Sequence, residues 1–201
     1  LAVNPINDTP VLSSIGFQSV DEDNTFTYTL SANDVDGDAL AYSAIASDGS
    51  VSVTGTTLTL IPDQDFNGDI QIDVTVDDGE LTDSGSFILT VNPVNDAPIL
   101  SSIDAQSVDE DNTFTYTLSA SDVDDVELEY TASVDGNASV SIDGSSLTIA
   151  PYLNYHGDIA VSVTVSDGQL TDSGSFTLTV TPVNDAPVLD TISDIDFDED
   201  T

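Results

Sequence analysis

The stretch that decides the fold is residues 68–91, which read GDIQIDVTVDDGELTDSGSFILTV. Apolar and polar side chains alternate over residues 70–76, and apolar residues recur at every second position at 87, 89 and 91. A period of two is typical of strands that bury one face. The Asp-Gly pair at residues 78–79 is a turn signal between the two runs. The stretch therefore predicts two β-strands separated by a turn.

The same pattern occurs twice in the chain. Residues 7–10 (Asn-Asp-Thr-Pro) return as Asn-Asp-Ala-Pro at residues 95–98 and 184–187, with spacings of 88 and 89 residues. A period of this kind is the mark of a repeat architecture, and it has to be found before any other feature is interpreted. It divides the chain into the end of a preceding repeat (1–3), repeat 1 (4–91), repeat 2 (92–180) and the start of a third repeat (181–201). We therefore expect the chain to be part of a longer array.

Each repeat contains about seven short runs of alternating apolar residues, and none of the runs has a helical period. Turn signals such as Asp36-Gly37 and Asp143-Gly144 separate the runs. About seven strands in ~90 residues is the pattern of an immunoglobulin-like Greek-key sandwich. The predicted fold class is all-β, with tandem immunoglobulin- or cadherin-like sandwiches.

The composition excludes several classes of function. The 201 residues include 38 acidic side chains, no Lys, no Arg and one His, so the formal net charge is −38. A chain without fixed positive charge cannot clamp phosphates, which argues against nucleic-acid partners and polybasic membrane docking. No Cys is present, so disulfides and thiolate-bound metals are excluded. No apolar run approaches the ~20 residues of a membrane span.

About half of the acidic residues recur at equivalent positions near strand ends and turns. Loops of a sandwich gather at its two ends, so these side chains can converge there. Converging carboxylates repel one another unless a cation lies between them. Calcium takes six to eight oxygen ligands from carboxylates, amides and carbonyls in flexible geometry, whereas magnesium prefers few protein ligands. The acidic clusters therefore predict Ca²⁺ binding.

Three of these motifs together resemble a known family. They are the linkers at 95–98 and 184–187, Asp-Glu-Asp at 21–23, and Asp-Val-Asp at 34–36 and 122–124. They are similar to cadherin-type repeats, above all to the cadherin-like repeats of large bacterial (RTX-type) surface adhesins. The resemblance covers both repeats and both partial ends. It implies calcium between successive repeats, which stiffens the array, and a secreted or cell-surface location.

The resemblance also implies a set of ligands for each junction. For the central junction these are Glu22, Asn95, Asp96, Asp122, Asp124 and Asp167. Half of an upstream junction would be formed by Asn7, Asp8, Asp34, Asp36 and Asp78. Half of a downstream junction would be formed by Glu110, Asn184 and Asp185.

The chain departs from the cadherin pattern in three respects. The linker is one residue shorter, and Pro93 and Pro182 stand where cadherins place an aspartate. The Asp-Arg-Glu motif is missing because the chain has no Arg. Asp65 is a candidate substitute in repeat 1, whereas repeat 2 has Asn154 there. The number of ions per junction is left open by these differences.

Three roles remain in competition. The first is a calcium-stiffened spacer of an adhesin, whose partners are the neighbouring repeats. The second is a subunit of an extracellular filament or matrix, which pairs with other copies of itself. The third is a module that binds extracellular polysaccharide, against which the absence of Trp counts. A catalytic role has little support, since the acids are duplicated and no Lys, Cys or second His is present. The single histidine, His156, is interpreted as a loop side chain.

Overall fold

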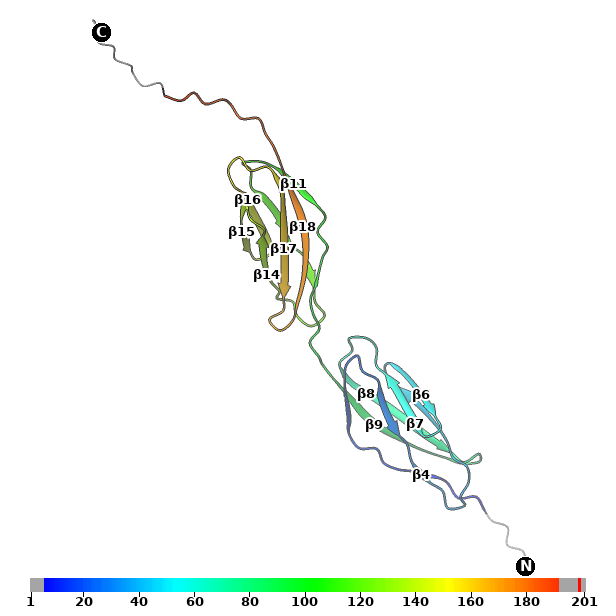
Figure 1. Cartoon of the computed structure of the whole chain (residues 1–201). Helices are drawn as coiled ribbons and strands as arrows, with labels where there is room; N and C mark the ends of the chain where they lie inside the picture. Colours follow the sequence, from blue (N-terminus) through cyan, green and yellow to red (C-terminus); the bar gives the residue numbers. More distant parts are fainter. Residues whose placement is uncertain (1–5, 192–198, 200–201) are drawn as a thin grey trace, which may run out of the picture. The chain divides into compact units, whose positions relative to one another are not determined.

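The computed structural model describes residues 6–191 and residue 199 (Figure 1). The chain divides into two units, Leu1–Asn95 and Asp96–Thr201. The expected end of a preceding repeat at residues 1–3 and the acidic positions 198 and 200 lie outside the described residues. Residues 182–191, from the expected third repeat, contain no strand. No helical segment in the described part of the chain has the length and apolar character of a membrane crossing.

The first unit contains nine strand elements and no helix among its described residues. They are β1 (Val11–Leu12), β2 (Gln18–Asp21), β3 (Phe26–Thr29), β4 (Ala32–Asn33), β5 (Ala41–Ala46), β6 (Ser50–Thr54), β7 (Thr57–Ile61), β8 (Gly68–Asp77) and β9 (Thr82–Asn92).

The second unit repeats this order. Its elements are β10 (Ile99–Leu100), β11 (Gln106–Asp109), β12 (Phe114–Thr117), β13 (Ala120–Ser121), β14 (Glu129–Val134), β15 (Ala138–Asp143), β16 (Ser146–Pro151), β17 (Gly157–Ser166) and β18 (Thr171–Thr181).

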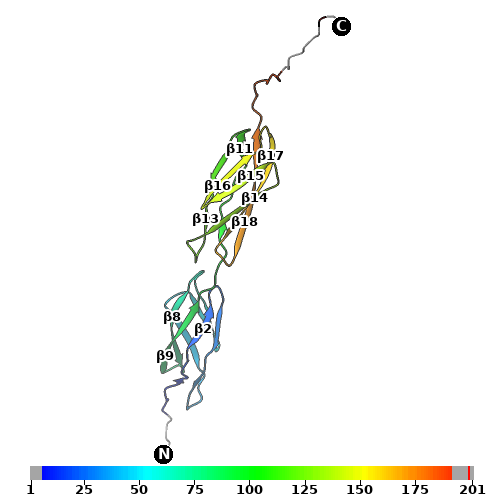
Figure 2. The ribbon, with the colours of Figure 1, turned by 90° about the vertical axis from the view of Figure 1, so that its left-hand side faces the viewer.

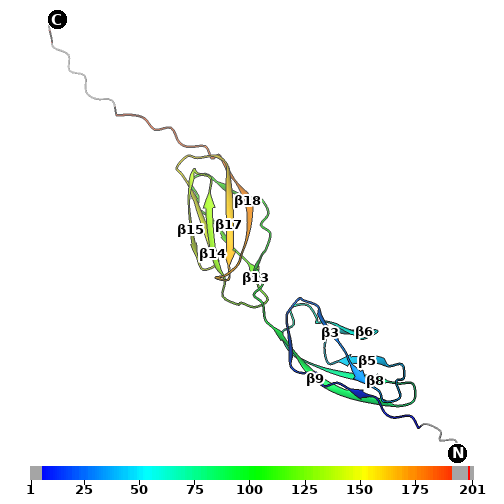
Figure 3. The ribbon, with the colours of Figure 1, turned by 60° about the horizontal axis from the view of Figure 1, so that its bottom comes forward.

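Each unit is a sandwich of two sheets. In the first unit one sheet has the order β2-β9-β8-β5, and the opposite layer contains β3-β7-β6 and the short pair β1-β4. Figure 3 shows β3 and β6 on one side of this unit and β8 and β9 on the other. The second unit has the same two layers, β11-β18-β17-β14 and β12-β16-β15, with the pair β10-β13. The predicted all-β sandwich is confirmed.

The nine elements of a unit correspond to the seven predicted strands, because two strands are interrupted. The first strand is split between the layers: β1 pairs antiparallel with β4, whereas β2 pairs parallel with β9. Figure 2 shows β2 beside β9. Residues 13–17 cross from one layer to the other. The second strand is broken into β3 and β4 at residues 30–31.

The core of each unit lies between its two layers and follows the predicted alternation. In the first unit Ile70, Ile72 and Val74 of β8 and Leu89 of β9 have no exposed surface, and their polar neighbours face outward. The rings of Phe26, Tyr28 and Phe87 pack together, with centroids 6.2–6.4 Å apart. Equivalent residues form a separate core in the second unit. Each unit thus provides a rigid frame with loops at both of its ends.

Candidate metal centre

The predicted ligands lie in two groups at opposite ends of each unit. One group surrounds the start of β9 or β18, and the other surrounds the residues that follow these strands. β9 and β18 each have 11 residues. At ~3.4 Å per residue such a strand spans roughly 35 Å, so the two groups of one unit cannot share an ion. We call them the N-terminal end and the C-terminal end of the unit.

At the N-terminal end of the first unit, the loop between β4 and β5 is folded around Asp34. One oxygen of Asp34, Oδ1, accepts the N–H groups of Gly37 and Asp38 at 2.9 and 3.2 Å. Carboxylate oxygens of Asp34, Asp36 and Asp38 lie within 4.8 Å of one another. Three carboxylates at that separation repel strongly, which a divalent cation would relieve.

The second unit builds the same loop around Asp122. Its Oδ1 accepts the N–H groups of Asp124 and Asp125, both at 2.9 Å. Position 126 is Val where the first unit has Asp38, so the second loop has one carboxylate fewer at that place.

The second carboxylate oxygen is the unusual feature of both loops. Oδ2 of Asp34 and Oδ2 of Asp122 are each buried without a hydrogen-bond partner in the described structure. A buried polar atom without a partner is costly, and a buried carboxylate oxygen especially so. The same atom is left in this state at the same position of two separate units. A cation bound to this Oδ2 atom would provide the partner that the oxygen lacks.

The linker residues are attached to these loops by hydrogen bonds. Asp36 Oδ2 accepts the Asp8 N–H at 2.7 Å, and Asp124 Oδ2 accepts the Asp96 N–H at 2.8 Å. The side-chain amide of Asn7 donates to Asp78 Oδ2 at 2.9 Å. The structure therefore brings together the Asn-Asp pair, the Asp-x-Asp pair and Asp78 at one end. Their role as metal ligands stays a prediction.

Asp78 also organises the turn between β8 and β9. Its Oδ1 accepts the N–H groups of Leu81 and Glu80 at 2.7 and 2.8 Å. The N–H of Leu81 above all, then the N–H of Glu80 and the Asn7 amide, hold the pKa of the Asp78 carboxyl below its ordinary value. Asp167 accepts the N–H groups of Gln169 and Leu170 in the equivalent turn, both at 2.6 Å.

At the C-terminal end of the first unit, the central group is a buried glutamate. Glu22 is only 2% exposed. The N–H of Val94 donates to its Oε1, and Asn67 Nδ2 lies 3.5 Å from its Oε2. The carboxylate therefore holds the chain just after β9 and faces the loop before β8.

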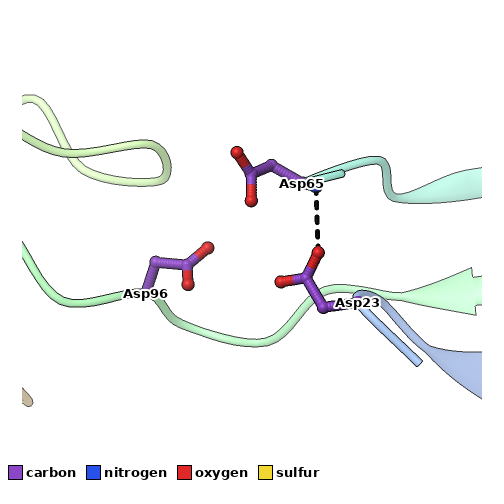
Figure 4. A group of neighbouring side chains, drawn as sticks. All are labelled: Asp23, Asp65 and Asp96. Atoms are coloured by element: carbon purple, nitrogen blue, oxygen red, sulfur yellow. Dashed lines mark hydrogen bonds between the residues drawn. The ribbon is translucent and has the colours of Figure 1, made fainter. Parts of the chain in front are cut away.

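Beside Glu22, the two aspartates Asp23 and Asp65 form a pair. The N–H of Asp65 donates to Asp23 Oδ1 at 3.2 Å, as drawn in Figure 4. Both residues have left-handed backbones, with φ of 60° and 56°, a conformation that Asp adopts more readily than most residues. Asp96, also drawn in Figure 4, belongs to the second unit, where its N–H donates to Asp124.

The C-terminal end of the second unit keeps this frame with different side chains. Glu110, 6% exposed, accepts the Val183 N–H at 2.6 Å. Asp111 accepts the N–H of Asn154 at 2.8 Å, with φ of 62° and 56° at these two residues. His156 Nδ1 stands 3.8 Å from Glu110 Oε2, in the place of Asn67. Of the other predicted ligands, Asn184 donates to the carbonyl of Asp185 at 3.2 Å.

In the first unit, two acidic residues whose carboxylates lie against predicted ligands were missing from the predicted ligand set. They are Asp23, which is paired with Asp65, and Asp38, which completes the cluster with Asp34 and Asp36. Asp23 recurs as Asp111 in the second repeat, so the repeat itself contained a signal for it. Asp38 has no acidic counterpart in the second repeat, so the periodicity gave no sign of it.

Comparison with known proteins places the fold in a family. Residues 7–90 and 95–181 match the bacterial Ig domain family. Chitinase A of Pseudoalteromonas piscicida is 30% identical over 189 residues, which cover 92% of this chain and 23% of that protein. The chain thus spans less than a quarter of the length of this curated relative.

Solved structures with the same fold include pairs and triplets of cadherin domains. Human protocadherin-24 EC1-2 has a TM-score of 0.57 at 17% identity, covering 89% of this chain and 99% of that one. Mouse clustered PcdhgC3 EC1-3 has a TM-score of 0.50 at 18% identity, covering 90% of this chain and 70% of that one. At these identities the likeness shows a cadherin-like fold, in agreement with the fold implied by the sequence resemblance.

Proposed function

The chain belongs to the bacterial Ig domain family, and we propose that its two repeats form a non-catalytic spacer whose junctions bind calcium. The observation that carries the proposal is the buried, unpartnered Oδ2 of Asp34 and of Asp122 at equivalent positions of both units. Calcium binds carboxylate oxygens at Ca–O distances of ~2.3–2.6 Å and tolerates irregular coordination geometry. The dense negative charge of the chain favours a divalent cation further.

From the resemblance to cadherin-type repeats, we propose that the calcium site at the central junction uses residues of both units. The Val94 N–H is held by Glu22 of the first unit, and the Asp96 N–H is held by Asp124 of the second. Two residues of chain span at most ~7 Å. One ion that binds the carboxylates on both sides of this segment would restrict the hinge. Without it, like charges repel and domain motion is the default.

Thermal unfolding tests the calcium site. The chain is unfolded at fixed NaCl with millimolar calcium, with magnesium, and with chelator. A ligand at ~100 times its dissociation constant stabilises by ~2.7 kcal/mol, which raises the midpoint by several degrees. Asp122→Asn keeps an oxygen for the loop N–H groups and should lose most of the calcium effect. Asp73→Asn, at an exposed position in the middle of β8 and away from both ends, is the matched control. A calcium response that is unchanged in Asp122→Asn would contradict the assignment.

Stiffening is tested separately by the distance between the units. The chain has no native cysteine, so spin labels can be placed at Ser52→Cys and Ser141→Cys, two exposed strand positions in different units. Calcium should narrow the distribution of label distances, and Asp122→Asn should abolish the narrowing. If the distribution of label distances is equally wide with calcium and with chelator, calcium does not stiffen the chain, and the proposed spacer mechanism is wrong.

We further propose that the spacer works outside the cell, as part of a protein that acts on polysaccharide. This proposal rests on the 30% identity to a chitinase over 189 residues. An origin in an adhesin, as the sequence resemblance implies, has the same spacer mechanism. Digestion of intact cells with a protease, followed by antibody detection of the chain, tests the location; full protection of the chain would contradict it.

A further inference from the structure

A groove on the first unit has no function in the spacer. It lies where residues 13–17 cross between the layers and leave β9 partly uncovered. β2 pairs only with Leu89–Asn92 of β9, so residues 84–88 pair with β8 alone among the described strands. The groove beside this open edge has a volume of about 320 Å³ and is lined by Phe17, Gln71, Ser86 and Ile88, among others.

An exposed aromatic ring stands at this groove. Phe17 is 94% exposed, although a phenyl ring gains by burial. Phe17 precedes Gln18, which pairs with Leu89, and Ile88 pairs with Gln71 across β9 and β8. The three side chains therefore form a row across the outer face of the sheet. The Gln71 amide nitrogen donates to Asp73 Oδ1 at 3.0 Å, which fixes the orientation of the amide.

The second unit lacks this row although it has the same frame. Strand register makes Ala105 the counterpart of Phe17, Ala160 that of Gln71 and Thr177 that of Ile88. Ser86 and the core ring Phe87 are unchanged, as Ser175 and Phe176. The fold therefore does not need the larger side chains. At all three positions the first unit carries the larger side chain, and together these side chains enlarge the apolar and amide surface beside the groove.

We propose that this groove binds a chain of neutral pyranose sugars. A phenyl ring and an isoleucine offer an apolar face to the C–H face of a sugar ring, and Gln71, Ser86 and the open edge of β9 offer partners for its hydroxyls. A volume of about 320 Å³ is at the lower end of small-molecule sites.

Charge narrows the choice of ligand further. With 38 acidic and no basic side chains, the protein repels uronic acids, sulfated sugars and a second copy of itself. Neutral sugars pay no such electrostatic cost. The inference goes beyond the calcium spacer and does not depend on it.

The experiment is an NMR titration of the whole ¹⁵N-labelled chain with chitohexaose and, separately, cellohexaose, each in calcium and in chelator. We expect shifts at residues 15–17, 71 and 86–88, with a dissociation constant of about 1 mM or tighter. Signals of residues 103–105, 160 and 175–177 serve as the internal control and should stay in place. Shifts in chelator as well as in calcium separate this result from the calcium proposal. No shift with either hexamer overturns the inference.

Variants carry the test to the individual side chains. Phe17→Ala should weaken binding at least tenfold, and the triple change Phe17→Ala, Gln71→Ala, Ile88→Thr should abolish it. Each new residue is the one that the second unit carries, so folding should be preserved, and an unchanged thermal midpoint verifies this. The reverse triple, Ala105→Phe, Ala160→Gln, Thr177→Ile, should create a second site. Equal affinity of Phe17→Ala and the parent chain overturns the inference.

Two further controls exclude other occupants. Hexagalacturonate, the anionic counterpart, should cause no shift at the groove. Sedimentation at rising protein concentration should show a monomer with or without Phe17→Ala. Self-association that Phe17→Ala abolishes would assign the groove to a second copy of the chain and overturn the sugar site.

Discussion

The C-terminal ends of the two units have the same backbone but different chemistry. In both ends a buried glutamate holds the chain after the last strand, and an aspartate with a left-handed backbone holds the neighbouring loop. All five residues of the loop before β8 differ at the second end, where residues 152–156 replace residues 63–67. Three of these differences change the polar groups near the glutamate: Asp63 is replaced by Tyr152, Asp65 by Asn154 and Asn67 by His156.

This difference separates the residues that maintain the fold from those that concern a ligand. The hydrogen bond between the loops survives the change from Asp65 to Asn154, since the donor is a backbone N–H in both units. The carboxylates at positions 63 and 65 are therefore unnecessary for the geometry. Under the proposed calcium binding, the first end would be the stronger site and the second end the weaker one, because affinity for calcium depends on the number of charged ligands.

The largest expected effect comes from removal of the shared glutamate. Glu22→Ala leaves the Val94 N–H without its acceptor, which should destabilise the first unit by about 1–3 kcal/mol. Glu110→Ala should do the same to the second unit through Val183. Hydrogen exchange of β8–β9 and β17–β18 amides reads the two units separately.

Glu22→Gln is the control for charge. It keeps an oxygen for the Val94 N–H, so the first unit should keep its stability in chelator while it loses stabilisation by calcium. A loss in chelator as large as that of Glu22→Ala would show that the negative charge, and not the hydrogen bond, maintains this end.

The next effect concerns the backbone at Asp23. Alanine at a φ of 60° carries a steric penalty of ~1–2 kcal/mol, and Asp23→Ala also loses the acceptor for the Asp65 N–H. We expect the unfolding midpoint of the first unit to fall accordingly. Asp23→Asn, which tolerates this backbone, should be nearly neutral without calcium. Asp111→Ala should lower the unfolding midpoint of the second unit by a similar amount. A large difference between the two decreases would show that Asp23 and Asp111 are not structurally equivalent.

The frame that these predictions test was largely predictable from the sequence. Alternation over residues 70–76 and 87–91 identified the buried face of β8 and β9, because neighbouring side chains of a strand point to opposite faces. The split of the first strand was not predictable. Its two halves pair with strands at different distances along the chain, and residues 13–17 carry no periodic signal.

The sequence predicted which side chains gather at the N-terminal ends, but it did not predict their geometry, and their role as metal ligands stays a prediction. The recurrence of Asp-Val-Asp and Asn-Asp motifs indicated which residues gather at the N-terminal ends, where the hydrogen bonds now join them. The burial of Glu22 depends on a partner 72 residues away, which no local pattern reveals. The exposure of Phe17 was not predictable either, because residues 13–17 have no alternation that would assign its ring to one face, and the ring is 94% exposed.

A smaller effect is expected from exchanging the charge between the two ends. Asp65→Asn should lower calcium affinity about tenfold, which corresponds to ~1.4 kcal/mol, and should leave stability in chelator unchanged. Asn154→Asp should raise the affinity of the second end when the following residues 183–185 are present. Calorimetric titration measures both. If neither variant changes the affinity, the difference between the two ends has no bearing on calcium.

The smallest effect concerns acid unfolding at the N-terminal end of the first unit. The folded pKa of Asp78 lies below its value of 3.8 in the unfolded chain, because the N–H groups of Leu81 and Glu80 and the Asn7 amide favour the carboxylate. Its contribution to stability is therefore complete above pH 3.8 and is lost as the pH falls through the lower, folded pKa. Asp78→Asn keeps an oxygen for the two N–H groups but does not titrate. The difference in urea midpoint between parent chain and variant should be constant above that pH and should shrink below it. A difference that stays constant down to the acid transition would show that Asp78 acts through the shape of its turn alone.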